Sequence, residues 1–218
     1  MKRIFTPLTI VAAAMFAYAP FMILDAPYES TMGLVQKIFY FHVPAGMTLF
    51  LAACVSGVGS ALFLFTRKPW ADRLAVAGAE VSVVLGLIVL VTGPLWARKA
   101  WGVWWVWDPR VTSTLVMLLI FNAYLLLRRY GGPGSDRLSA TVALFGMANV
   151  PFVYWSVNVW RTLHPKTSVV PTLPSGLRGP FWFCVVAFTL VTVLVIAARA
   201  ELEKRRQELD VLYLVLED

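Results

Sequence analysis

The chain contains two histidines, His42 in FYFHVPAG and His164 in WRTLHPK. Each is closely followed by a proline, which stiffens the backbone beside the imidazole ring. Neutral imidazoles bind transition metals, but two of them are too few for a closed tetrahedral zinc site unless carboxylates join them. Two axial imidazoles are a complete protein contribution to haem iron, because the porphyrin supplies the other four ligands. A single histidine is more often a hydrogen-bonded structural residue than a ligand, so it is the pair that favours a metal site.

A tryptophan-rich segment, WGVWWVWDPR at residues 101–110, is the second unusual feature. A single tryptophan at the end of a membrane helix is ordinary, because the ring favours the interface. Four within seven positions cannot all face one lipid surface, whether the segment is helical or extended. A large, flat, apolar partner such as the haem plate would suit them. Haem also carries two carboxylates, for which Arg110 and Arg161 are the better candidates because guanidinium can bind carboxylate through two hydrogen bonds. Contact with lipid phosphate is the alternative for these cations.

The composition shows what must position these residues. The chain has 218 residues, of which 59% are hydrophobic and 14% charged, and its mean hydropathy is +0.73. This balance is too apolar for a soluble domain. Each of six apolar runs is near the roughly 20 residues that a helix needs to cross a bilayer. The runs are 4–24, 44–65, 74–96, 111–127, 138–158 and 180–198. We therefore predict an all-α integral membrane protein, with a domain of six transmembrane helices over residues 1–198.

The distribution of Lys and Arg predicts the orientation of these spans. Twelve of the nineteen lie at the termini and in two short connections, and seven lie in three longer segments between the other span ends. Because the richer side is normally cytoplasmic, we expect both termini inside the cell. Residues 199–218 then form a cytoplasmic amphipathic tail. The basic pI of 9.7 follows from loops that face anionic lipid in the bilayer, and it implies no nucleic acid partner.

The span count brings the candidate residues to one side of the membrane. Four spans separate the two histidines, and two separate each histidine from the tryptophan-rich segment. An even number of crossings returns the chain to the same face. We therefore expect function to reside in three periplasmic segments, the tryptophan-rich segment 96–110 and the histidine-bearing loops 25–43 and 159–179.

Together with FHVP before it and WRTLH after it, WGVWWVWDPR resembles the WWD signature of the CcmC family, the haem exporter protein C family of cytochrome c maturation. The three motifs occur in the family's order, and the resemblance covers nearly the whole chain. Larger haem-handling relatives share the WWD signature but are longer and have more spans. The sequence departs from the family pattern at Gly46 and Met47, where Ala and Trp are expected, and at Pro165, where a polar residue is more usual.

The resemblance implies a protein of the bacterial inner membrane that is not an enzyme. It would bind b-type haem non-covalently at the periplasmic face and present it to the membrane-anchored haem chaperone CcmE. Further implied partners are the ATP-binding-cassette subunits CcmA and CcmB and the small subunit CcmD. His42 and His164 are the expected axial ligands of the haem iron. The other residues expected to bind haem are Trp101, Gly102, Trp104, Trp105, Trp107, Asp108, Arg110 and Arg161.

Two motifs are absent from the sequence, as expected of a chain that binds haem non-covalently and leaves ATP hydrolysis to its partners. The sequence contains no GxxxxGK[ST] phosphate-binding loop, so ATP hydrolysis would belong to a partner. It also contains no CxxCH for covalent haem attachment, and Cys54 and Cys184 fall at different membrane depths, which argues against a disulfide.

Three alternative functions stay open. The chain could move haem across the membrane, act as a secondary transporter, or be a membrane oxidoreductase. A transporter would need more polar residues at the midplane than the sequence offers, and an oxidoreductase with intramembrane haems would place paired histidines inside helices. For Glu80, the one acidic residue inside a predicted span, three interpretations stay open: a functional role, reaching the interface, or pairing with Arg73.

Overall fold

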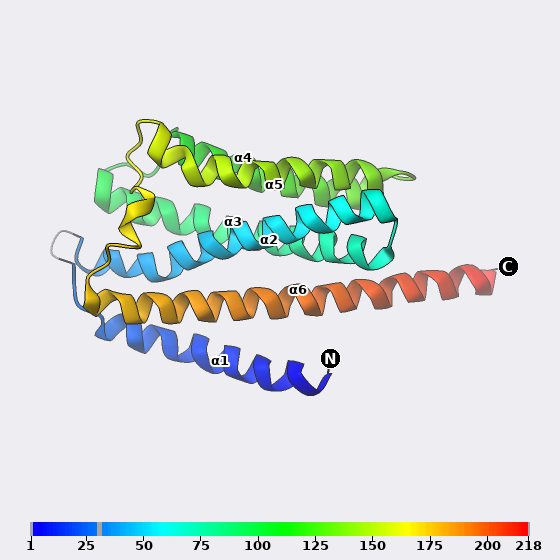
Figure 1. Cartoon of the computed structure of the whole chain (residues 1–218), viewed down its shortest axis with the longest axis horizontal. Coiled ribbons are helices and arrows are strands. Elements are labelled where there is room, and N and C mark those ends of the chain that lie inside the picture. Colours follow the sequence, from blue (N-terminus) through cyan, green and yellow to red (C-terminus); the bar gives the residue numbers. More distant parts are fainter. Residues whose placement is uncertain (1, 30–31, 218) are drawn as a thin grey trace.

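The structure is a computed structural model that describes residues 2–29 and 32–217 (Figure 1). Residues 1 and 218, and residues 30 and 31 of the predicted outer segment, lie outside the described residues. The described part folds into helices alone, and six of them are long and apolar enough to cross a membrane, which confirms the predicted fold class. The long helices are α1 (Lys2–Asp25), α2 (Phe39–Thr66), α3 (Pro69–Trp101), α4 (Pro109–Tyr130), α5 (Ser135–Val159) and α6 (Ser175–Glu217). Two short 3-10 helices, η1 (Leu34–Ile38) and η2 (Thr167–Val169), lie in the connections.

Several helix ends follow local chemistry. Helices α3 and α4 begin with Pro69 and Pro109, whose missing N–H groups cost nothing in a first turn. Helix α3 ends at Trp101 and is capped by Gly102, which adopts a left-handed conformation (φ 75°) that glycine tolerates because it has no Cβ. The chain can therefore turn sharply just after Trp101.

The helices extend beyond the apolar runs that predicted them. Helix α2 begins at Phe39, so His42 lies in a helix and not in the preceding loop. Helix α6 continues without a break from Ser175 to Glu217, so the predicted separate tail is the end of the sixth spanning helix. Charged residues do not stop a helix, and no glycine or proline follows Pro180. Ion pairs four residues apart, Glu201–Arg205 and Lys204–Glu208, support this extension.

Helices α2 and α3 form the centre of the bundle. Helix α2 packs against α3, α5 and α6, whereas α1 lies at the edge against α6 (Figure 1). Small residues let α2 and α3 approach closely, because a Cβ added at Gly78 would lie 2.7 Å from the Ser56 nitrogen. The Ser56 hydroxyl donates a hydrogen bond across this interface to the Ala75 carbonyl (2.9 Å).

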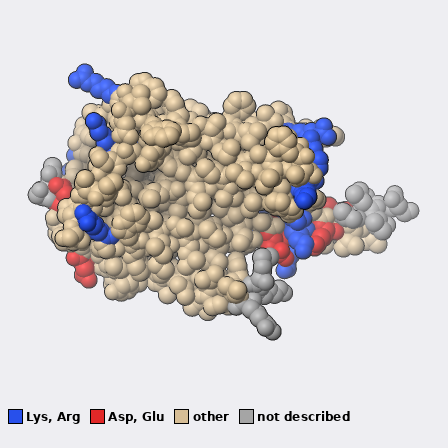
Figure 2. All heavy atoms as spheres, viewed as in Figure 1, with Lys and Arg blue, Asp and Glu red and all other residues tan. Residues whose placement is uncertain are grey.

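Charged side chains gather at the two ends of the molecule and leave a broad uncharged belt between them, as Figure 2 shows. This is the surface expected of a helical bundle embedded in lipid. Both termini point toward the end that carries the α2–α3 and α4–α5 connections (Figure 1). We call this the terminal end and the opposite one the site end. Which end faces the cytoplasm stays a prediction.

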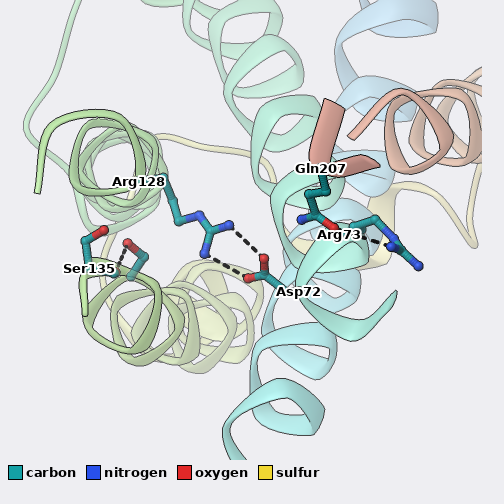
Figure 3. Close-up of polar contacts among 6 residues, drawn as sticks. Asp72, Arg73, Arg128, Ser135 and Gln207 are labelled. Atoms are coloured by element: carbon teal, nitrogen blue, oxygen red, sulfur yellow. Dashed lines mark hydrogen bonds and ion pairs between the residues drawn. The ribbon is translucent and has the colours of Figure 1, made fainter. Parts of the chain in front are cut away.

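Ion pairs and a hydrogen bond join the helices near the terminal end. Asp72 on α3 accepts two hydrogen bonds from Arg128 on α4 (2.9 and 2.7 Å), and Arg73 donates to Gln207 on α6 (3.3 Å) (Figure 3). Glu80 pairs with Arg199, whose Nη2 lies 2.7 Å from Glu80 Oε1, so of the alternatives for Glu80 the one that named Arg73 as its partner is wrong. The unbroken course of α6 places Arg199 beside Glu80. Cys54 and Cys184 are both free thiols, as expected.

Candidate functional site

A cavity of about 570 Å³ lies at the site end, within the range typical of pockets for small molecules and cofactors, roughly 300–1,000 Å³. Its walls come from α2, α3, the first turns of α4, Tyr154 of α5, and residues of the connecting segments 32–36, 101–106 and 164–171 together with Glu29. The lining is mostly apolar. Both histidines line this one cavity, although 122 positions separate them in the sequence.

His42 is oriented by a hydrogen bond to the neighbouring helix. Its Nδ1 lies 2.9 Å from the hydroxyl of Thr92 on α3, and that hydroxyl donates its own hydrogen to the Ile88 carbonyl (2.7 Å). A hydroxyl has one hydrogen to donate, so Thr92 accepts from His42 and the imidazole hydrogen resides on Nδ1. The Nε2 lone pair is then free for a metal.

His164 adopts the same tautomer, with its hydrogen on Nδ1, through a different acceptor. Its Nδ1 lies 3.0 Å from the Pro165 carbonyl, which can only accept a hydrogen bond. Nδ1 therefore carries the hydrogen and Nε2 is free. Burial lowers the pKa of His164, and the nearby Arg110 guanidinium lowers it further, so the neutral, metal-binding form is favoured at neutral pH.

Asp108 connects the tryptophan-rich segment to the His164 loop. Its Oδ1 accepts from the Val111 N–H (2.9 Å) and caps the first turn of α4. Its Oδ2 accepts from the Thr162 hydroxyl, which in turn accepts from the His164 N–H (3.0 Å). Asp108 thus positions the loop without lining the cavity itself.

The tryptophan rings divide between the cavity and the surface. Trp101, Trp104 and Trp105 line the cavity. Trp107 does not line it and is 75% exposed, with its ring packed edge-on against Trp105 (5.4 Å between centroids). Trp104 is itself 57% exposed, so one wall of the cavity lies at the molecular surface.

The cavity contains donor groups that lack acceptors. Arg110 lines it and donates through Nη2 to the Tyr154 carbonyl (3.2 Å). Among the described residues, the buried Nε of Arg110 and the buried indole Nε1 of Trp105 have no hydrogen-bond partner. Buried polar groups are normally paired, so these two N–H groups indicate that a ligand supplies acceptors here.

The structure therefore brings some of the expected site residues together and leaves others aside. His42, His164, Trp101, Trp104, Trp105 and Arg110 line the cavity. Gly102, Trp107, Asp108 and Arg161 do not, and Arg161 is exposed.

Sequence reasoning overlooked several contributors. Thr92 and Thr162 act through tertiary hydrogen bonds, and Lys166 contributes to the wall two residues after His164. Threonine is common in membrane helices, so no local pattern distinguishes Thr92. Lys166 could have been found by its proximity to His164.

The fold and the site define a class: helical membrane proteins that span the bilayer several times and hold a ligand cavity at one boundary. Among sequence families, the model of "Heme exporter protein C" matches residues 1–213. Heme exporter protein C of Bradyrhizobium diazoefficiens is 35% identical over 190 residues, which cover 83% of this chain and 72% of the relative. The Escherichia coli K12 protein of the same name is 31% identical, and the match covers 83% of this chain and 77% of the relative. The Paracoccus denitrificans protein of that name is also 31% identical, and the match covers 83% of this chain and 78% of the relative. The chain belongs to the heme exporter protein C family.

Proposed function

We propose that this chain binds one b-type haem non-covalently at the periplasmic face of the bacterial inner membrane and presents it to a CcmE-like chaperone for cytochrome c maturation. The observation that carries the proposal is that two histidines from distant parts of the chain line one apolar cavity, each with Nε2 free. Family membership supports the same conclusion, since the relatives are named heme exporters.

The residues of the cavity fit haem better than a bare metal ion. Among the described residues, no three His, Cys, Asp or Glu side chains come close enough to hold a metal. A porphyrin needs only two further ligands for its iron, and His42 and His164 would provide them. Trp101, Trp104 and Trp105 would cover part of the plate, and the unpaired N–H groups of Trp105 and Arg110 suit a ligand that carries carboxylates. When bound, the haem supplies the iron centre, and the chain's own residues bind and orient it.

A partly open cavity suits a protein that must release what it binds. The exposed indole of Trp104 and the exposed side chain of Lys166 both line it, so the rim reaches the surface beside the segments that carry both histidines. A chaperone could approach haem from this side. The chain has no phosphate-binding loop, so we assign ATP hydrolysis to the CcmA and CcmB subunits and include CcmD in the assembly.

Absorption spectroscopy of the full-length protein purified in detergent tests the proposal. We expect a Soret band with the low-spin signature of two axial imidazoles. His42→Ala and His164→Ala should each lower haem occupancy and remove the low-spin signature, and added imidazole should partly restore both. Trp105→Ala should lower occupancy while the remaining haem stays low-spin. An unchanged low-spin spectrum in the double histidine variant would show that the ligands lie elsewhere.

A second experiment tests transfer. The haem-loaded protein is mixed with a CcmE-like chaperone, and haem is followed onto the chaperone. Transfer that proceeds from wild type and fails from the double histidine variant would support presentation. Wild-type protein that keeps its haem in the presence of the chaperone would argue for storage or transport instead.

A further inference from the structure

Lys166 is a cation at the rim of the cavity, and the proposed function gives it no role. It follows His164 by two positions, lines the cavity and is exposed. Among the described residues, no carboxylate pairs with its amine. Its charge is therefore available to a ligand.

The backbone beside Lys166 is fixed although its side chain is exposed. Lys166 caps the short helix η2, and its carbonyl accepts from the Val169 N–H (3.2 Å). The next residue, Thr167, is held to α5 because its hydroxyl accepts from the Asn158 side-chain amide (2.9 Å). The lysine thus projects from an anchored point, which reduces the entropy lost when its amine binds a ligand.

The other cation of the cavity is placed differently. Arg110 is partly buried, is held by the Tyr154 carbonyl, and has a buried Nε without an acceptor. The cavity therefore has an inner cation, Arg110 on α4, and an outer cation, Lys166 in the loop that carries His164. Arg110 also lies near His164. A flat ligand with two carboxylates on one edge would match this pair.

We propose that Lys166 binds one propionate of haem at the rim while Arg110 binds the other inside the cavity. This assignment rests on the proposed function. It replaces Arg161, which is exposed and does not line the cavity. It would place both carboxylates of haem on the side of the cavity formed by α4 and the segment that carries Lys166.

Comparison of haem with haem dimethyl ester, whose carboxylates are masked, tests the assignment in the full-length protein. Lys166→Gln should weaken haem binding about two- to fivefold at low ionic strength, the range of an exposed ion pair. The loss should shrink at high salt, where exposed charges are screened. Binding of the ester should not change. Lys166→Arg should retain most of the affinity, and Lys166→Glu should lose more than Lys166→Gln.

Lys99→Gln is the matched control, because Lys99 is exposed near the same end and does not line the cavity. It should leave the ratio of haem to ester affinity unchanged. Equal losses for haem and ester in Lys166→Gln, or the same loss in Lys99→Gln, would overturn the assignment. A wild-type protein without a low-spin haem spectrum would instead overturn the proposed function, and the Lys166 assignment with it. A low-spin Lys166→Gln protein with the wild-type ratio would refute the assignment alone.

Discussion

Two different acceptors hold the two histidines, and both select the same tautomer. The Thr92 hydroxyl accepts from His42 Nδ1, and the Pro165 carbonyl accepts from His164 Nδ1. One acceptor lies on another helix and the other is the next residue in the chain. The orientation of His42 therefore depends on the packing of α2 against α3, whereas that of His164 is local.

We predict that Thr92→Val weakens haem binding through His42. Valine has nearly the same shape but cannot accept the Nδ1 hydrogen, so the imidazole loses its fixed direction. Loss of such a supporting hydrogen bond typically lowers metal affinity by about tenfold or more. Haem titration of the purified variant measures the loss, and the spectrum reports on the ligand.

Thr92→Ser keeps the hydroxyl and is the matched variant. It should bind haem with nearly wild-type affinity. If serine and valine variants lose affinity equally, the hydroxyl has no role in orienting His42, and the loss reflects packing alone.

At the scale of helices, Gly93 determines how closely α3 approaches His42, the proposed haem ligand. A Cβ added at Gly93 would lie 3.3 Å from His42 Cε1, a tighter contact than side chains normally make. We predict that Gly93→Ala displaces the imidazole by a few tenths of an ångström, lowers haem affinity and alters the low-spin spectrum. Absorption spectra and haem titration measure both effects.

Gly46→Ala is the control for this prediction. Gly46 also lines the cavity within a helix, but a Cβ there would lie 3.9 Å from Val89 Cγ2, an ordinary contact. Both substitutions gain about 1 kcal/mol of helix propensity, so a difference between them reports on His42. Equal affinities in the two variants would contradict the role of Gly93.

Hydropathy was sufficient to predict the number of spanning helices but not their ends. An apolar run marks the part of a helix that meets lipid, whereas a helix ends only where its hydrogen bonds are broken or capped. This difference explains why α2 takes in His42 and why α6 continues to Glu217. Glu80 is an example: its partner Arg199 lies 119 positions later in the chain, in the part of α6 that extends beyond the apolar run.

The sequence indicated several of the residues that line the cavity, because they are chemically unusual. Two histidines and a cluster of tryptophans are rare enough in one chain to be found without a structure. Thr92 could not be found because its role depends on contact with a side chain 50 positions away. Arg161 was a candidate because it is a guanidinium on the same predicted face as the histidines; it is exposed and does not line the cavity, whereas Lys166 does.

At the scale of the whole molecule, the buried Asp72–Arg128 pair joins α3 to α4 at the terminal end (Figure 3). The two side chains are only 10% and 19% exposed. We predict that Arg128→Met lowers the free energy of unfolding by about 3–5 kcal/mol, because it leaves a buried carboxylate without its partner. Denaturant titration in mixed micelles measures the change.

The exposed Lys204–Glu208 pair provides the comparison. Its side chains are 47% and 61% exposed, so Lys204→Met should cost about 0–1 kcal/mol. The double variant Asp72→Leu/Arg128→Met should recover most of the stability lost in Arg128→Met, since it removes both charges. A double variant as unstable as Arg128→Met would show that packing, not the unpaired charge, is responsible.

The distribution of charge predicts the orientation of the molecule in the membrane. Because twelve of nineteen Lys and Arg residues lie on the side of the termini, we expect the terminal end in the cytoplasm and the histidine cavity in the periplasm. Single cysteines can report this once Cys54 and Cys184, the two native thiols, are replaced by alanine. Ser168→Cys, in the exposed His164 loop, should react with a membrane-impermeant maleimide in cells whose outer membrane alone has been opened. Tyr130→Cys, at the exposed end of α4, should react only after the inner membrane is disrupted. The reverse pattern would place the cavity in the cytoplasm and exclude direct presentation of haem to a periplasmic chaperone.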